Sequence, residues 1–155
     1  MSKQEKLLRE TVHMVRDTCL CLATQRAART LSRLFDDAFR PLGITSGQFS
    51  LMMALSRPLP WRIGDLANML AMDRTTITAN LKPLERDGFV SIAIDKDDKR
   101  GRNATLTSKG HVLLKRALPI WKETHREVDK MLARDPDPLR ADLTALSGVH
   151  SMSEP

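Results

Sequence analysis

The sequence has little of what several protein classes require. It contains two cysteines, too few for the disulfide framework of a small secreted protein, and it contains no tyrosine. No apolar stretch approaches the ~18 residues that a membrane-spanning helix needs. The first ten residues, MSKQEKLLRE, lack the apolar core of a secretory signal. We therefore expect a cytoplasmic protein.

What is present is an ordinary globular composition with a basic excess. The 155 residues are 41% hydrophobic and 28% charged, which fits one compact domain, or one domain with appended helices, and argues against wholesale disorder. Lys and Arg number 25 against 19 Asp and Glu, which gives a formal net charge of +6. This excess indicates a polyanionic partner, either nucleic acid or a membrane surface.

The N-terminal third has helical periodicity. Residues 12–39 contain neither Pro nor Gly, and their apolar positions recur at steps of three and four, so we expect one long helix there. The segment 40–43, with its Pro and Gly, should end that helix. Thr45 with Gln48 three residues later has the spacing of a capping box, which predicts a second helix that ends before Pro58.

Two shorter helices and a hairpin should follow. We expect a helix over 63–70 and another between its cap, Asp73, and a glycine after its last turn, Gly88. Residues 89–94 and 103–107 are rich in β-branched residues and flank a charged turn, which predicts two strands.

The C-terminal third should again be helical. Thr107 or Ser108 can cap a long helix over residues 109–134. The run Asp135-Pro136-Asp137-Pro138 should end this helix, and residues 139–146 form a candidate short one. The predicted fold is therefore mainly α with a small β-wing.

The third of the central helices is the candidate for DNA recognition. The central elements follow the order of a winged helix-turn-helix: two short helices, a third helix with a polar outer face, and then a hairpin. In such a motif the N-terminal residues of the third helix reach base edges in the major groove. Its apolar stripe, Ile77, Leu81 and Leu84, should face inward. The candidate DNA-contacting residues are Arg74, Thr75, Thr76, Thr78, Ala79 and Lys82. The alternative is a solvated face, but Thr forms helices poorly, so three within four positions favour a binding role.

The charged turn supplies the candidate wing tip, with Asp98, Lys99, Arg100 and Arg102. Arginines at a hairpin tip can enter a narrow minor groove, where the negative potential is strong. Taken alone, such a turn is more commonly a solvated loop. Its position after the candidate recognition helix favours DNA binding.

The run ITSGQFSLMMAL…IGDLANMLAMDRTTITANLKPLERDGFVSIAIDKDDKRGRNATLTSKG resembles the MarR family of bacterial transcriptional regulators. The pieces that carry the resemblance are ITSGQF, the LA-x-x-L turn, TIT-x-NLKPLE-x-x-G, and Asp98-x-Arg100 before LT-x-x-G. The resemblance assigns Pro83, an unusual residue inside a helix, to a variant of the family pattern. It implies that Asp98 orients Arg100. Ala79 departs from the pattern, because many members have a groove-facing arginine there.

The resemblance also implies an assembly. Residues 1–155 would form a single domain, in which helices 12–39 and 109–150 make the dimerisation layer and residues 45–107 make the winged helix-turn-helix. Two copies would then bind one pseudo-palindromic operator of double-stranded DNA.

Catalytic and metal-binding patterns are missing. The sequence contains no Gly-rich phosphate loop, no G-x-S-x-G and no H-E-x-x-H, so we do not expect an enzyme. The four histidines, His13, His111, His125 and His150, show no ligand spacing with cysteines or carboxylates, so we expect neither a metal nor another cofactor.

Cys21 leaves one alternative open. On a continuous helix Cys19 and Cys21 would lie about 200° apart and could not bridge. Cys21 falls where the hydroperoxide-sensing branch of the MarR family has its reactive cysteine, but that branch polarises the thiolate with tyrosines, which this chain lacks. The other interpretation is a buried cysteine that acts as a small hydrophobe.

The sequence thus predicts a dimeric, sequence-specific DNA-binding regulator. A repressor released by a small-molecule effector is the main hypothesis, with no membrane partner. The alternatives are a redox-responsive regulator that uses Cys21, or a winged-helix module that binds protein instead of DNA.

Overall fold

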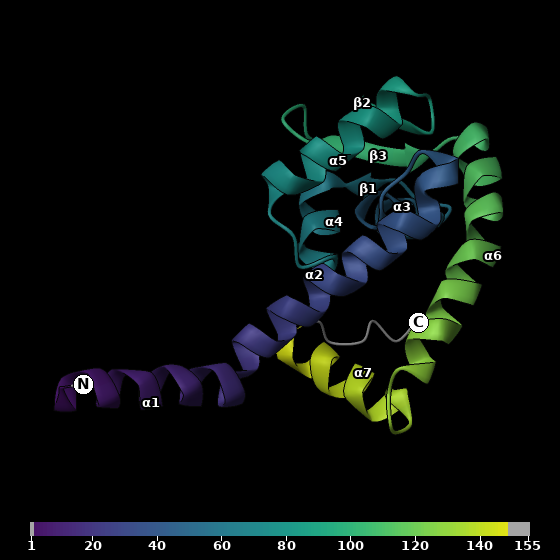
Figure 1. The fold of residues 1–155 in the computed structure, drawn as a ribbon. Helices are drawn as coiled ribbons and strands as arrows, with labels where there is room; N and C mark the ends of the chain where they lie inside the picture. The colour runs from purple at the N-terminus through teal and green to yellow at the C-terminus, as the bar shows by residue number, and fades with distance from the viewer. Residues whose placement is uncertain (1, 149–155) are drawn as a thin grey trace. The chain divides into compact units, whose positions relative to one another are not determined.

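The computed structural model describes residues 2–148, and within that range the side chain of Lys3 is not described. The described chain divides into two compact units, one that ends at Leu34 and one that begins at Phe35. Figure 1 shows the elements of each unit. Within the described residues, no helix is both long enough and apolar enough to cross a bilayer.

The first unit contains α1 (Lys3–Thr18) and most of α2 (Leu20–Phe39). The predicted single helix over residues 12–39 is wrong in its start and in its continuity. A helix already begins at Lys3, and the chain leaves the helical conformation at Cys19, where φ is −75° and ψ is 106°. Ser2 and Glu5 form a capping box that starts α1. Cys19 accepts the first hydrogen bonds of α2, through its sulfur from the Leu22 amide (3.4 Å) and through its carbonyl from Ala23.

The second unit begins with the last turn of α2. A 3₁₀ turn, η1 (Arg40–Leu42), follows and ends at Gly43, whose φ of 70° suits glycine. Helix α3 (Ser46–Ala54) then begins at the predicted capping box, in which Thr45 and Gln48 bond to each other's backbone amides. The prediction for this helix start is confirmed.

Helices α4 (Ile63–Met69) and α5 (Arg74–Arg86) form the next pair. The Asp73 carboxylate accepts the Thr76 amide at 2.8 Å, which confirms Asp73 as the cap of α5. After α5, Gly88 has a φ of 76° and the Phe89 amide donates to the Leu84 carbonyl at 2.8 Å. This is the left-handed helix ending predicted from Gly88.

The sheet has three strands where the sequence predicted two. Strands β2 (Val90–Ile94) and β3 (Arg102–Leu106) form the expected hairpin, and β1 (Trp61–Arg62) pairs with the other edge of β3. All pairs are antiparallel, in the order β1-β3-β2. A strand of two residues has no periodicity of its own, so only pairing with β3 reveals it.

Helices α6 (Ser108–Lys130) and α7 (Pro136–Leu146) complete the described chain. Helix α6 ends at Lys130, four residues before the predicted end. The Asp135-Pro136 pair begins α7 and does not merely end α6: Asp135 caps the helix, and Pro136 occupies a first-turn position, where its missing amide costs nothing. Residues 149–150 of the predicted dimerisation layer, and with them His150, lie outside the described residues.

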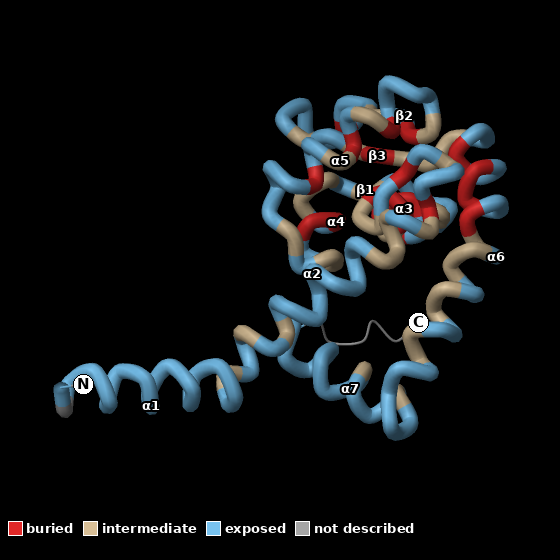
Figure 2. The backbone as a smooth tube through the Cα atoms, in the orientation of Figure 1, coloured by how far each residue is buried: buried red, intermediate tan, exposed pale blue. Residues whose placement is uncertain are grey.

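The buried core joins the elements that carry the wing and α5 (Figure 2). Its largest fully buried side chains are Phe39, Leu51, Met52, Leu55, Leu66, Ile77, Leu81 and Leu84. They come from the end of α2 and from α3, α4 and α5. Since α5 contributes three of these side chains, its rotation about its own axis is fixed by packing, and its opposite face is left outside.

Candidate nucleic-acid interface

The outer face of α5 consists of the residues that the sequence singled out. Thr75, Thr78, Ala79 and Lys82 are exposed, opposite the buried stripe. Together with Arg74 and Pro83 they line a shallow surface hollow of about 580 Å³. A strip of hydroxyl, methyl and ammonium groups on an exposed helix is the kind of surface that reads base edges.

Two threonines of this helix have hydroxyls that are already engaged. The Thr76 hydroxyl donates to the Asp73 carboxylate at 2.6 Å, and the Thr78 hydroxyl donates to the Arg74 carbonyl at 2.8 Å. The hydrogen bonds from Thr76 lower the pKa of Asp73. Thr76 thus belongs to the helix cap, whereas Thr78 still offers its methyl group and its oxygen as an acceptor.

The wing is organised by a carboxylate that the sequence did not single out. Asp95 directly follows β2 with a side chain only 5% exposed, and it accepts hydrogen bonds from the backbone amides of Asp97 (2.8 Å) and Asp98 (3.3 Å). Its other oxygen lies 2.8 Å from Nε of Arg62 on β1. The amide of Asp97, then that of Asp98 and the charge of Arg62, lower the pKa of Asp95 against the effect of burial.

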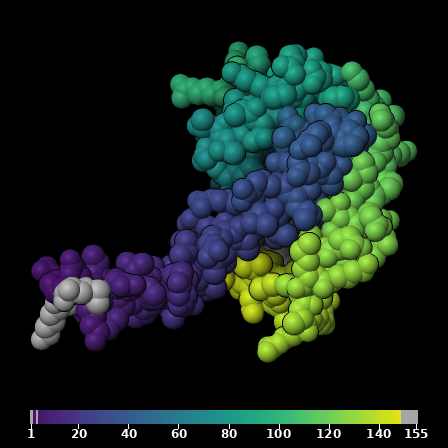
Figure 3. Space-filling view, viewed as in Figure 1, coloured from purple at the N-terminus to yellow at the C-terminus, as the bar shows by residue number. Residues whose placement is uncertain are grey.

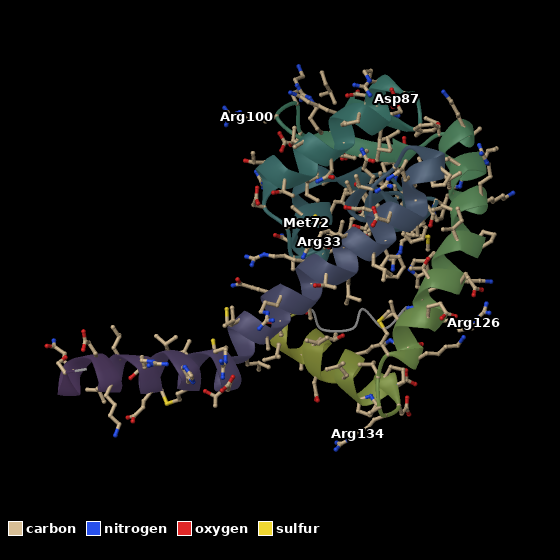
Figure 4. The ribbon with its side chains drawn as sticks, in the orientation of Figure 1. Arg33, Met72, Asp87, Arg100, Arg126 and Arg134 are labelled. Carbon is tan, nitrogen blue, oxygen red and sulfur yellow. The ribbon has the colours of Figure 1, made fainter. Side chains whose placement is uncertain are left out.

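Three of the residues predicted for the wing differ in what their side chains bind. The Asp98 carboxylate accepts the backbone amide of Arg100 at 3.0 Å, so it shapes the turn. The Arg102 guanidinium folds back on the carbonyls of Lys99 and Gly101. Figure 4 shows Arg100 projecting from the wing tip, and its side chain has no hydrogen bond or ion pair with residues 2–148. The side chains of Lys99 and Arg100 both have their donors free of partners among residues 2–148.

A second hollow lies between the helix pair and the wing. Its volume is about 470 Å³. Figure 3 shows the wing tip projecting from the surface of the second unit. The lining side chains that carry charge are Arg62, Asp65, Arg74, Asp98, Arg100 and Arg102. The predicted recognition and wing residues therefore meet in one surface, and the structure adds Arg62 to them. No local sequence signal marks Arg62, because its importance comes from pairing with β3 and from the approach of Asp95.

The cysteines lie in the first unit. The 200° separation expected for Cys19 and Cys21 does not apply, because Cys19 is not helical. Cys21 is exposed, and its sulfur accepts a hydrogen bond from the Gln25 side chain at 3.2 Å, while Arg29 donates to the other end of that amide at 3.3 Å. Sequence reasoning missed Gln25 as a donor to the thiol.

Comparison with known proteins gives a consistent family. The model of the MarR family matches residues 44–101, which include α3, α4, α5 and the wing up to Gly101. A crystal structure of the transcriptional regulator MosR from M. tuberculosis in complex with DNA superimposes with a TM-score of 0.75 at 35% identity, covering 84% of this chain and 94% of that one.

Two curated regulators are also similar. The chain is 34% identical over 107 residues to the transcriptional activatory protein BadR of Rhodopseudomonas palustris, covering 66% of this chain and 61% of BadR. It is 31% identical over 94 residues to the transcriptional repressor YetL of Bacillus subtilis, covering 59% of this chain and 56% of YetL. The chain thus spans less than two thirds of the length of these two relatives. With the MosR likeness over nearly the whole of that chain, these matches establish that the protein belongs to the MarR family of transcriptional regulators.

Proposed function

We propose that this protein is a homodimeric regulator of transcription that binds double-stranded operator DNA, with α5 in the major groove and the wing at the minor groove. The observation that carries the proposal is the position of α5. Its buried stripe fixes the helix, its exposed Thr75, Thr78, Ala79 and Lys82 line one hollow, and Thr78 also lines the hollow that Arg100 of the wing borders. The likeness to MosR, a regulator solved in complex with DNA, supports the same docking here.

The exposed apolar residues support a dimer. In α1 and α2 they are Leu7, Leu8, Val12, Met14, Val15, Leu20 and Leu31. Near the end of α6 and in α7 they are Met131, Leu132, Leu139, Leu143 and Leu146. Leaving so many large apolar side chains in water is unfavourable, so we infer that a second copy covers them. Residues 12–39 and 109–150 would then form the dimerisation layer of a single domain, and 45–107 the DNA-binding part.

We propose repression that a small-molecule effector relieves. Two half-sites one helical turn apart lie roughly 34–36 Å apart, so an effector that changes the distance between the two recognition helices prevents both from docking at once. BadR is named an activator and YetL a repressor, so similarity alone does not distinguish repression from activation. Transcription from the target promoter in vitro, measured with and without the protein, distinguishes them. We also propose that the protein acts in the cytoplasm, because that is where a bacterial regulator meets chromosomal DNA.

Fluorescence anisotropy on the DNA upstream of the protein's own gene tests the proposal. We expect binding to that duplex to be much tighter than to a scrambled duplex of equal length, and to weaken steeply as salt is raised. Sedimentation of the free protein at micromolar concentration should give twice the chain mass. A monomer, or equal affinity for both duplexes, would contradict the proposal and favour a protein-binding module.

Cys21 gives a second mode of release, favoured by one contact. The Gln25 amide donates a hydrogen bond to its sulfur, and the thiol is exposed, so a hydroperoxide can reach it. Operator affinity before and after stoichiometric cumene hydroperoxide separates the two modes. Unchanged affinity supports release by a small molecule, whereas release in the wild type that Cys21→Ser abolishes would make the protein a redox regulator.

A further inference from the structure

The hollow beside the wing gathers arginines from three separate segments. Arg62 comes from β1, Arg74 from the first turn of α5, and Arg100 and Arg102 from the wing. Two carboxylates, Asp65 and Asp98, also line it. Arginine forks match the oxygens of a phosphate, and the excess of positive charge suits a group with a single negative charge.

Arg62 has one side of its guanidinium engaged and the other side free. Its Nε lies 2.8 Å from the buried Asp95 carboxylate, while its side chain remains 50% exposed on the wall of the hollow. Its terminal nitrogens make no hydrogen bond to any residue from 2 to 148. A single side chain therefore touches both the base of the wing and the space where an anion would lie.

Gly64 makes room for the second arginine. A Cβ built at Gly64 would lie 2.9 Å from Nη2 of Arg74, closer than such atoms approach. The guanidinium of Arg74 therefore lies against the start of α4, at the edge of the hollow.

We propose that this hollow binds a phosphodiester group of the DNA backbone, and that Arg62 is the positioning residue that couples this contact to the wing. The proposal rests on the DNA-binding function proposed above and deepens it. Nε of Arg62 neutralises Asp95, which in turn holds the amides of Asp97 and Asp98, while the terminal nitrogens bind the phosphate. Loss of Arg62 removes a phosphate donor and also leaves the charge of Asp95 without its partner.

The salt dependence of operator binding tests the phosphate contact. Each lost phosphate contact lowers the slope of log K against log salt by about 0.9, so Arg62→Gln, which acts in both half-sites of a dimer, should lower it by about 1.8. Arg40→Gln is the matched control, because Arg40 is an exposed arginine of η1 that also pairs with a carboxylate, Asp37, and lies outside the hollow, residues 45–107 and the proposed dimerisation layer. Arg62→Lys keeps the charge and should keep most of the slope. Equal slopes for Arg62→Gln and Arg40→Gln would overturn the proposal.

Asp65 offers a change of opposite sign. Asp65→Asn removes a negative charge from the hollow and should tighten binding to both operator and scrambled DNA, because the phosphate carries no sequence information. Unchanged or weaker binding would count against an anion in the hollow. This variant tests the site even if Arg62→Gln fails to fold.

Hydrogen exchange tests the coupling to the wing without DNA. Arg62→Gln should speed the exchange of the Asp97 and Asp98 amides in the free protein, since their acceptor loses its partner, and Arg40→Gln should not. Unchanged exchange would refute the coupling, because a purely electrostatic contact with DNA would leave these amides as they are.

Inorganic phosphate distinguishes DNA from a small anion as the occupant. Added to the free protein without DNA, in place of chloride at constant ionic strength, it should change the melting temperatures of wild type and Arg62→Gln by the same amount, because one phosphodiester is held in the hollow only by the rest of the duplex. A rise in melting temperature that only phosphate causes, and that Arg62→Gln abolishes, would assign the hollow to a free anion. If the wild type fails to prefer its upstream DNA, the proposed function itself fails, whatever the variants do.

Discussion

Replacing Gly110 by Ala should destabilise the protein, although alanine is the better helix former. Gly110 lies in the first turn of α6, and a Cβ there would lie 2.2 Å from the Phe89 carbonyl oxygen and 2.6 Å from Cδ1 of Leu106. The carbonyl is held in place, because it accepts hydrogen bonds from the amide of Thr107 (3.0 Å) and from its hydroxyl (3.1 Å). Backbone must therefore move to admit the methyl group.

Packing and helix propensity predict changes of opposite sign in the free energy of unfolding of Gly110→Ala. Helix propensity alone predicts stabilisation by up to about 1 kcal/mol on Gly→Ala. Overpacking of a well-packed site costs about 1–3 kcal/mol, and a fixed carbonyl puts this site at the upper end. We therefore expect a net loss of about 2 kcal/mol in the free energy of unfolding.

Urea denaturation followed by circular dichroism, at one fixed protein concentration, measures this loss. Gly47→Ala is the matched control, because Gly47 also lies in a first helical turn and the nearest atom to its Cβ would be Oδ1 of Asn80, at 3.3 Å, which belongs to a side chain and not to the backbone. The control should be neutral or slightly stabilised. A Gly110→Ala protein as stable as wild type would refute the packing argument.

Four further changes test the interface and the core. Arg100→Ala should weaken binding to operator and scrambled DNA alike and lower the salt slope by about 0.9 per lost contact; a loss confined to the operator would contradict backbone or minor-groove binding. Thr78→Val should instead cost roughly 1–3 kcal/mol in discrimination at particular base pairs, measured with single-substituted operators, and a uniform loss would count against base reading. The pKa of Asp95 is lowered in the folded state, so its ionised form stabilises the protein above its unfolded value of about 3.9, and that stabilisation is lost as the pH falls through the lower folded value. The difference in melting temperature between wild type and Asp95→Asn should therefore shrink below about pH 4; a difference that persists in acid would exclude the charge as its cause. Leu81→Ala, at a fully buried site in α5, should cost about 2–5 kcal/mol in urea denaturation, and a value below about 1 kcal/mol would show that α5 is not fixed by the core.

The helix ends that lie close together in sequence could be predicted without a structure. The Thr45–Gln48 capping box, the Asp73 cap and the Gly88 ending each satisfy backbone groups with residues at most five positions away, so the pattern of residues suffices. The same holds for the two faces of α5, because the 100° step per residue fixes which side chains share a side.

Tertiary structure decided the features that depend on residues far apart in sequence. Strand β1 exists because Trp61 and Arg62 pair with β3 some forty residues later, and this pairing brings Arg62 to Asp95. Read along the chain, Asp95 is one of several charges in a polar turn; burial and two backbone amides make it the centre of the wing. The break at Cys19 was missed for a different reason. Apolar periodicity continues across it, and the amide of Leu22 in the first turn of α2 is accepted by the Cys19 sulfur, an atom that rarely caps a helix. Local hydrogen bonds are determined by neighbouring residues and can be predicted from them. Strand pairing, burial and ion pairs across the fold depend on which distant segments the core brings together.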